Sequence, residues 1–502
     1  MAPHSRKHIF GLSFLLSTLI FTGCSSIFDA RKQKKDIMSN YIAGNYQEAI
    51  KLTDEKLKNR EGSGDELMWR LEEGTLKFDE SNYGGSLSDF EKAELIATDF
   101  DNRADANIRR AGAEVGSAMT NPNALPYRGL NSDRIMLQAY KFFDYATRGN
   151  SSGAMVELRR MRERQKIAEQ ELQDEIAKEQ EGIVAANREN AQKSQSQGRP
   201  SSVYFATLGS NGRISQSINE MNAKINKTYS ACMNPFAVYL SAIGYLYENN
   251  FGEALVDFRR LFEMVPENSF VRRDFTTCSS IAGFEIPETL KDVKPFDFPL
   301  ETGTVYVIFA NGRGAALKQV KIDLILPFVG YTGFAYPELE YFPSPYDRLM
   351  VTAGNGEVVP TETVADMDAI ISQEYSQRLP GIITRIAIST IAKEVASAAA
   401  VYAARKAKNG WATAGAYVAT GIYKYLFNTA DTRCWETLPK YYQICQLKMP
   451  ENETVQLTPC IGNYTVPGKT IQIRLDKNKK INIIYVKSQS PDVFLGKVFF
   501  LN

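Results

Sequence analysis

The sequence predicts an α+β protein with several domains, in which an α-helical N-terminal half built from repeats precedes a β-rich C-terminal domain with an inserted helical hairpin. Three observations support this prediction. An asparagine-led unit recurs through the first half, the composition changes near Pro287, and short apolar runs with strand-like patterns follow. At 502 residues the chain is also too long for one core, so two to four domains are expected.

The repeated unit is a turn led by asparagine that runs into a helix whose first packed residue is small. Its clearest copy, Asn-Phe-Gly-Glu-Ala, occupies residues 250–254. Similar units start at Asn45, Asn82 and Asn150. A small residue at the fifth position lets two helices approach closely, so we interpret the unit as a packing device rather than a reactive group. The small residues of the four copies are Ala49, Ser86, Ala154 and Ala254.

This unit resembles the tetratricopeptide repeat, whose first helix carries a W-x2-L-G-x2-Y pattern and whose second helix carries an A-x3-F pattern followed by a proline. The clearest copy matches it with Ala242, Tyr245, Ala254, Phe258 and Pro266. The second copy matches at Gly74, Ser86, Phe90 and Ala93, and the fourth at Phe142, Tyr145, Ala154 and Leu158. The resemblance implies a solenoid of stacked helix pairs with an extended binding surface. Its candidate partner-binding residues are Tyr245, Phe258 and Tyr145. An irregular helical domain with chance echoes is the alternative.

Residues 1–23 have the features of a secretory signal. Arg6 and Lys7 precede an apolar run at residues 9–20, and Phe-Thr-Gly-Cys closes the segment at Cys24. This ending resembles a bacterial lipoprotein box, which implies that Cys24 carries fatty acyl chains and becomes the first mature residue. Ser25 in place of Asp implies transfer to the outer membrane, facing the periplasm. A simple cleaved signal is the alternative.

The charge and the histidine content narrow the function. The net charge is +1, which gives no general case for binding nucleic acid. The only histidines, His4 and His8, lie in the predicted signal, so the mature chain has no imidazole. We therefore expect no Ser-His-Asp or Cys-His nucleophile, no histidine-ligated zinc, no cofactor and no enzymatic activity.

Five cysteines follow Cys24, and none of their spacings is typical of a metal site. In an oxidising compartment we expect one or two disulfides, most readily among the last three, and a remaining free thiol. The five are Cys232, Cys278, Cys434, Cys445 and Cys460.

A long charged helix is predicted from residue 157, because alternating charges surround a thin apolar seam at helical spacing. Either the helix is simply solvated, or it is a projecting arm that pairs with another chain. The seam consists of Leu158, Met161, Ala168, Leu172, Ile176 and Ile183.

The predicted boundaries follow from these features. They are a signal at 1–23, helical repeats at 24–156, the charged helix and a linker at 157–200, further repeats at 201–286, and a β-rich domain at 300–502. In the last of these, Asn311-Gly312 is expected to form a hairpin turn between strands at 304–309 and 320–326. Further strands are expected at 331–342, 348–352, 470–475, 481–487 and 493–501.

Residues 366–427 are expected to be helical, with Pro380 starting the first arm of a hairpin (381–404) and 410–427 forming the second. Charged residues interrupt both arms, which favours a buried hairpin over membrane insertion. These residues are Arg385, Lys393, Glu394 and Lys424.

Residues 430–439 read Ala-Asp-Thr-Arg-Cys-Trp-Glu-Thr-Leu-Pro. We expect Asp431 and Arg433 to form a local ion pair, with Trp435 as an anchor beneath it. This run resembles one in an uncharacterised family of bacterial tetratricopeptide-repeat-containing outer-membrane lipoproteins. The resemblance implies a helical half, a β-rich half and an envelope location, and no known reaction.

The sequence thus predicts a membrane-anchored periplasmic scaffold or adaptor that binds protein partners during envelope assembly. The alternative is a self-associating structural or pore-forming component that uses the alanine-rich helices and the charged arm. The particle size in detergent distinguishes the two.

Overall fold

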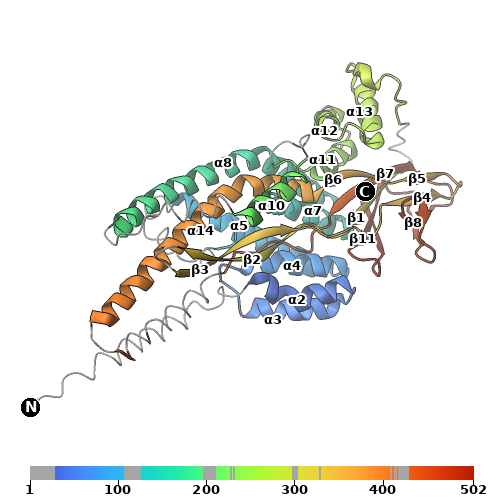
Figure 1. Cartoon of the computed structure of the whole chain (residues 1–502). Helices are drawn as coiled ribbons and strands as arrows, with labels where there is room; N and C mark the ends of the chain where they lie inside the picture. The colour runs from blue at the N-terminus through green and yellow to red at the C-terminus, as the bar shows by residue number, and fades with distance from the viewer. Residues whose placement is uncertain are drawn as a thin grey trace, which may run out of the picture.

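The computed structural model describes residues 29–106, 126–195, 211–226, 229, 232–296, 303–326, 330–406, 410–411, 415 and 429–501. Helices make up the N-terminal half and sheets dominate the C-terminal part (Figure 1), so the predicted α+β class is confirmed. The bounds of the helices are α2 (Ala30–Ile42), α3 (Tyr46–Lys58), α4 (Glu66–Asp79), α5 (Tyr83–Ala106), α7 (Asn131–Thr147), α8 (Ser151–Gln195), α10 (Gly212–Asn222), α11 (Pro235–Tyr247), α12 (Phe251–Met264), α13 (Ser269–Ala282), the short 3₁₀ helix η3 (Glu288–Leu290) and α14 (Met367–Lys406).

Each of the four repeated units forms a helical hairpin with the same turn. The residue before the asparagine has a positive φ, between 59° and 79°. The asparagine N–H then donates to a carbonyl five residues earlier, as Asn250 does to Tyr245 at 2.8 Å. This is how helices commonly end when one residue adopts the left-handed conformation. The residues with positive φ are Gly44, Ser81, Gly149 and Asn249.

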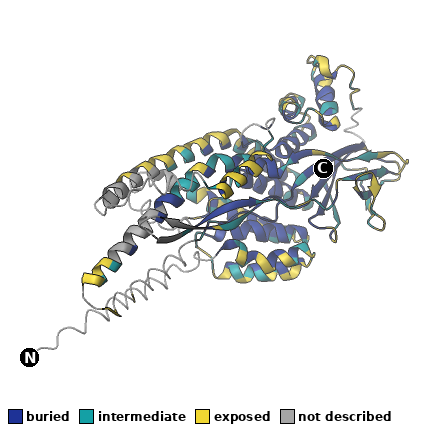
Figure 2. Cartoon of the chain, viewed as in Figure 1, coloured by how far each residue is buried: buried dark blue, intermediate teal, exposed yellow. Residues whose placement is uncertain are grey.

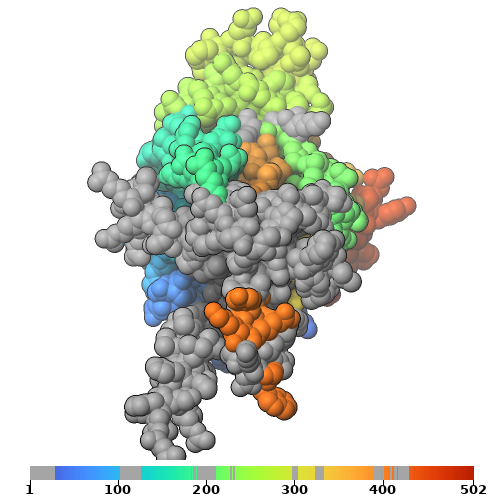
Figure 3. Space-filling model, turned by 60° about the vertical axis from the view of Figure 1, so that its left-hand side comes forward, coloured from blue at the N-terminus to red at the C-terminus, as the bar shows by residue number. Residues whose placement is uncertain are grey.

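The small residue that follows each turn lies in the contact between the two helices. Ala49, Ser86, Ala154 and Ala254 are all fully buried. The hairpins are α2–α3, α4–α5, α7–α8 and α11–α12, and each packs against the next along the chain, with α13 packed on α12. In Figure 3 helices α11–α13, in yellow-green, stand at the top of the molecule. The interpretation of the unit as a packing device therefore agrees with the structure.

The strands form three sheets. The central sheet has the order β12-β11-β1-β7-β6, in which β1 is parallel to β11 and antiparallel to β7. A second sheet has the order β10-β8-β4-β5, with β9 paired to β8, and β2 and β3 form a two-stranded hairpin. The bounds are β1 (Thr304–Asn311), β2 (Ala316–Leu326), β3 (Gly330–Glu340), β4 (Arg348–Ala353), β5 (Val358–Pro360), β6 (Glu362–Asp366), β7 (Tyr441–Lys448), β8 (Thr454–Ile461), β9 (Tyr464–Thr465), β10 (Ile471–Arg474), β11 (Ile481–Ser488) and β12 (Leu495–Leu501).

The hairpin predicted at Asn311-Gly312 is wrong. β1 and β2 do not pair, because β1 lies between β11 and β7 in the central sheet, whereas β2 pairs with β3. Gly312 does adopt a positive φ of 73°. The sequence therefore predicted the turn conformation of the backbone correctly. The strand that follows the turn, however, does not pair with β1.

The inner helices of the hairpins cover one face of the central sheet. Phe236 of α11 stacks on Tyr442 of β7, with ring centroids 3.8 Å apart and planes within 3°. Phe78 of α4 and Phe143 of α7 both contact Tyr485 of β11. Most buried residues of the helices and sheets thus form one continuous core, and Figure 2 shows the central sheet and inner helices largely in dark blue. A smaller cluster lies between α10, α14 and the β2–β3 hairpin.

The long charged helix is present as α8, with 45 residues, but its seam is not solvated. Leu158, Met161, Ala168 and Leu172 are buried, because α7, α11 and α14 pack against α8. The side chain of Ile183 lies outside the described residues. Exposed residues recur along the outer face of α8 from Ser152 to Glu181 (Figure 2).

Helix α14 runs parallel to α8. It does not start at Pro380. Gln173 donates to Gln377 at 2.9 Å, Arg378 pairs with Glu175 at 2.8 Å, and Arg385 pairs with Glu179. Pro380 lies inside the helix, so the predicted start there is wrong. Met367, Ala369 and Ile370 are buried before it, and Ile386, Ala387 and Ile388 are buried after it. Most of the predicted second arm, 410–427, lies outside the described residues.

Candidate functional site

The inner face of the helical stack is the surface on which a tetratricopeptide-like protein would hold a partner peptide, and here the chain itself occupies much of it. Residues 430–439, which we call the closing segment, run between the inner helices and the sheet without forming a helix or strand. Every residue of the closing segment except Asp431 is buried. Several of its backbone groups bond to side chains of helices about 360 to 400 residues earlier in the chain.

A buried charge cluster fixes the middle of the closing segment. The Lys34 ammonium of α2 lies 2.9 Å from Glu72 of α4 and 2.6 Å from Glu436 of the segment, and it donates to the Cys434 carbonyl at 2.7 Å. All three charged side chains are at most 4% exposed. Burial by itself lowers the pKa of Lys34, but Glu436 and Glu72 raise it well above its ordinary value. Lys34 therefore stays charged and binds the segment to α2 and α4.

Glu72 also accepts hydrogen bonds from the turn at the end of the segment. The Glu436 N–H donates to it at 2.8 Å and the Thr437 N–H at 3.2 Å, and the Thr437 hydroxyl donates at 2.9 Å. One carboxylate thus satisfies two backbone donors that would otherwise be buried without partners. Nothing in the sequence singled out Lys34 or Glu72, since both are charged residues within ordinary helical patterns.

Trp435 anchors the segment in an aromatic pocket. Its ring lies 5.8 Å from that of Phe90 and 5.6 Å from that of Tyr140, centroid to centroid. Its Nε1–H donates to the hydroxyls of Thr75 at 3.0 Å and Thr437 at 2.9 Å. The indole is 2% exposed, so it combines a large buried apolar surface with a satisfied donor.

The ion pair expected in the closing segment is present. Arg433 contacts Asp431 through Nε at 2.8 Å and Nη2 at 2.7 Å. Its Nη1 also reaches Asp65, just before α4, at 2.9 Å. Burial lowers the pKa of Arg433, and the two carboxylates raise it above its ordinary value, Asp431 most. The sequence predicted the local pair but missed Asp65, because no local pattern links residues this far apart.

The three candidate partner-binding residues lie in contacts between the chain's own helices. Phe258 is fully buried and packs against Tyr239 of α11. Tyr245 bonds to Arg162 of α8 at 2.7 Å, and that guanidinium lies 4.8 Å from the ring centroid. Tyr145 donates to Glu91 of α5 at 3.1 Å. The two tyrosines thus occupy equivalent places, each joining an inner helix to the preceding hairpin. A partner role for these residues stays a prediction.

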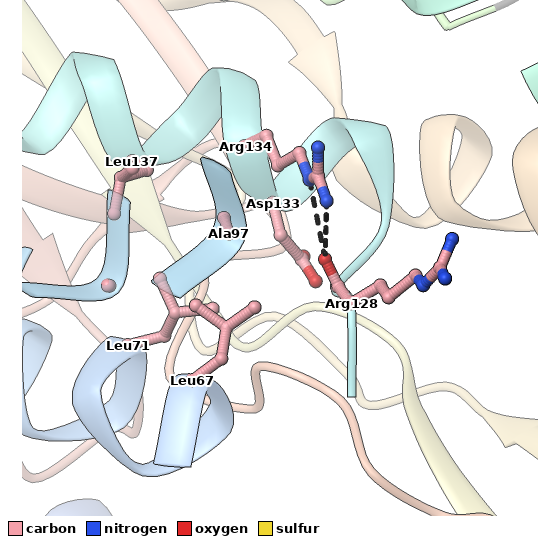
Figure 4. Close-up of a pocket in the computed structure, with 9 residues that line it drawn as sticks. Leu67, Leu71, Ala97, Arg128, Asp133, Arg134 and Leu137 are labelled. Atoms are coloured by element: carbon pink, nitrogen blue, oxygen red, sulfur yellow. Dashed lines mark hydrogen bonds between the residues drawn. The ribbon is translucent and has the colours of Figure 1, made fainter. Parts of the chain in front are cut away.

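A small pocket lies between α4, α5 and α7, lined by Leu71, Asp133 and Arg134 among others (Figure 4). Its volume of about 10 Å³ accommodates about one water molecule. Arg134 donates to the Arg128 carbonyl at its rim, at 3.3 Å. Burial raises the pKa of Asp133 to about 7, although the Tyr127 hydroxyl and the Leu130 N–H both donate to it at 2.9 Å.

The predicted disulfides are wrong. All five cysteines after Cys24 are free and buried. They lie in separate elements of the core, such as Cys278 in α13, Cys434 in the closing segment and Cys445 in β7. Burial raises the pKa of each of these three thiols, which leaves them as weakly reactive core residues.

Three further observations concern metals, membranes and relatives. Among the described residues, no group of three or more histidine, cysteine or acidic side chains is arranged to hold a metal ion. None of the described helices combines the length and hydropathy needed to cross a membrane. Cys24 itself lies outside the described residues. No protein-family model matches the chain, and a search of curated proteins finds no match.

Proposed function

We propose that this chain is a lipid-anchored scaffold of the bacterial envelope that binds protein partners in the periplasm. The proposal combines the lipoprotein-like Cys24 with four hairpins that share one turn and pack in chain order. Stacked arrays of helical repeats typically present an extended surface to a partner. The assignment of the hairpins as tetratricopeptide repeats and the resemblance to the lipoprotein family are both part of this proposal.

The position of the closing segment limits where a partner can bind. Because residues 430–439 are buried against the inner helices, a partner peptide has to use a different surface. The outer face of α8 is the longest exposed helical face among the described residues. Val156 and Ile167 are 42% and 43% exposed, and they lie eleven residues apart, which places them on the same side of the helix. We assign partner contact to this face.

A cross-linked pull-down from envelopes tests the proposal. Tagged full-length protein is compared with a Val156→Asp/Ile167→Asp double variant. A matched control carries Val358→Asp on β5, a residue that is 50% exposed. We expect one defined partner with the wild type and the control, and at least a tenfold loss with the double variant. Because all three positions are exposed, the substitutions leave the core intact.

Two outcomes contradict the proposal. Recovery of mainly the chain itself, in large particles, supports the self-assembling component instead. Equal recovery of the partner by the double variant and the control removes α8 as the partner surface. A Cys24→Ser version, fractionated in parallel, tests the anchor separately, since it should no longer carry fatty acyl chains.

A further inference from the structure

The start of the folded body is fixed in place next to the proposed anchor. The Asp29 side chain accepts from the Arg31 N–H at 3.1 Å and from the Thr432 hydroxyl at 2.6 Å. Asp29 is only 9% exposed, so α2 starts from a residue held against the closing segment. Any tether from Cys24 therefore ends at a defined point on the molecule.

That tether is short. Five peptide units separate Cys24 from Asp29, and a fully extended chain of that length spans at most about 18 Å. This upper limit follows from covalent geometry and holds for any conformation of the intervening residues. An acylated Cys24 thus holds the N-terminal end of α2 within about 18 Å of the lipid surface, and the body cannot turn freely above it.

The helix end that the tether holds carries positive charge. The sequence from residue 31 to 35 is Arg-Lys-Gln-Lys-Lys, between Asp29 at the N-cap and Asp36. Lys34 points inward to Glu72, and Arg31 pairs with Glu340 of β3. Lys32 and Lys35 are exposed. Among the described residues, neither has an acidic partner within ion-pair distance.

The spacing of Lys32 and Lys35 places them on one side of α2. Residues three apart on a helix are neighbours on its surface, and both lysines lie on the side away from the buried residues Ile37 and Tyr41. Two ammonium groups therefore face solvent together, a few residues from the tether. Short acyl tethers and adjacent basic residues are the two signals that together hold a protein on an anionic membrane surface.

We propose that the N-terminal end of α2 docks on the membrane, with Lys32 and Lys35 binding the anionic headgroups of the leaflet that holds the acylated Cys24. The proposal rests on the lipid anchor of the proposed function. It gives the molecule one orientation, in which this end of α2 faces the lipid. The turn at residues 476–479 lies just before the start of β11. Gly312, whose N–H donates to the Ser488 carbonyl, lies at the other end of that strand.

The test measures which lysines the membrane protects. Full-length acylated protein is reconstituted into vesicles of phosphatidylcholine alone or with one part in five of phosphatidylglycerol. A water-soluble amine reagent labels the lysines, and peptide mass spectrometry compares labelling in vesicles and in detergent. We expect labelling of Lys32 and Lys35 to fall severalfold in anionic vesicles and to recover at high salt, because salt screens exposed charges. Lys477, which is 64% exposed, should not change.

A charge-reversal variant distinguishes docking through Lys32 and Lys35 from nonspecific protection by the nearby bilayer. Lys58 is exposed at the end of α3 and lies near the same end of α2, because Arg60 donates to Gln33 at 2.8 Å. In a Lys32→Glu/Lys35→Glu variant, protection of Lys58 in anionic vesicles should be lost. A Lys477→Glu/Lys479→Glu variant, with the same change in charge, should keep it.

The outcomes distinguish this inference from the proposed function. If the N-terminal peptide carries acyl chains but Lys32 and Lys35 are labelled equally in vesicles and detergent, docking is overturned while the anchor stands. If protection is the same in neutral and anionic vesicles, headgroup recognition by these lysines is also overturned. If Cys24 carries no acyl chain, both the anchor and the docking fail.

Discussion

At the scale of single residues, one buried carboxylate holds together parts of the chain that are far apart in sequence. Glu72 accepts the Lys34 ammonium, two backbone N–H groups and the Thr437 hydroxyl. Removing one partner of such a cluster leaves the others buried and unpaired, which costs more than the pair itself contributes. The sequence gives no sign of this role, because it depends on a turn that lies 364 residues later in the chain.

A substitution at Glu72 tests this role. We expect Glu72→Ala to destabilise the folded chain by about 3 kcal/mol or more, since Lys34 and the two N–H groups lose their acceptor. Glu48→Ala is the control, because Glu48 forms an exposed pair with Lys51, and such pairs contribute about 0–1 kcal/mol. Denaturant unfolding of both variants gives the comparison. Equal midpoints for the two variants would show that the cluster does not stabilise the fold.

The raised pKa of Asp133 predicts that the stability of the folded chain depends on pH. Its carboxyl group has a pKa of about 7 in the folded chain, against a reference value of 3.8, mainly because it is buried. Between these values the unfolded chain releases the proton and the folded chain keeps it, so stability falls as the pH rises and the full cost applies above pH 7. Asp133→Asn removes this cost while keeping an oxygen that can accept the bonds from Tyr127 and Leu130.

The stability of Asp133→Asn relative to the wild type should therefore increase by roughly 1.4 kcal/mol per pH unit between about pH 4 and pH 7. Denaturant unfolding at pH 5 and pH 8 measures this change. Parallel pH profiles for the two proteins would mean that Asp133 titrates near its ordinary value when folded.

At the scale of elements, the hairpins depend on close approaches between helices. A Cβ at Gly74 of α4 would lie 2.7 Å from the ring of Phe90 in α5. That ring is fully buried and lies between Tyr140 and Trp435, 5.4 Å and 5.8 Å away, so it has little freedom to move. Gly74 and Phe90 are two of the positions at which the second copy resembles the repeat pattern, and the two residues lie in contact.

A pair of glycine substitutions tests this contact. Gly74→Ala should destabilise the chain by about 1–3 kcal/mol, because it overpacks the interface between α4 and α5. Gly84→Ala should be neutral or stabilise by up to about 1 kcal/mol, because it lies in α5 with no atom near the added Cβ. Thermal unfolding of the two variants provides the measurement, and a loss at Gly84 as large as that at Gly74 contradicts the account.

Sequence patterns identified elements better than they identified pairings. The asparagine-led units located four hairpins because their turns are local. Strands at β1, β4, β11 and β12 were also expected near their observed positions. β7 and β8 were missed, although turn residues flank them at Pro450, Asn452 and Gly462-Asn463. The hairpin at Gly312 was wrong because strand pairing depends on distant segments. Similarly, the ion pair of Asp431 and Arg433 is local in sequence and was predicted. The contacts of Asp65, Glu72 and Lys34 with the closing segment join distant parts of the chain and were not predicted.

At the scale of the whole molecule, the closing segment joins the helical stack to the central sheet. Helices α2 and α4 contact it through buried charges, and α4, α5 and α7 surround Trp435. Lys487 of β11 also donates to the Thr437 carbonyl at 3.1 Å. The segment therefore lies in the core that both halves share. In the function that we propose, a partner binds the outer face of α8 and the N-terminal end of α2 faces the membrane.

Amide hydrogen exchange of the full-length protein tests most directly whether the chain closes the inner face of its own helical stack. The Glu436 and Thr437 amides should exchange as slowly as those of β1, since both donate to a buried carboxylate. The amides of the exposed turn at residues 476–479 should exchange far faster. Exchange of Glu436 and Thr437 at the rate of that turn would show that the segment leaves the inner face in solution, which would then be open to a partner.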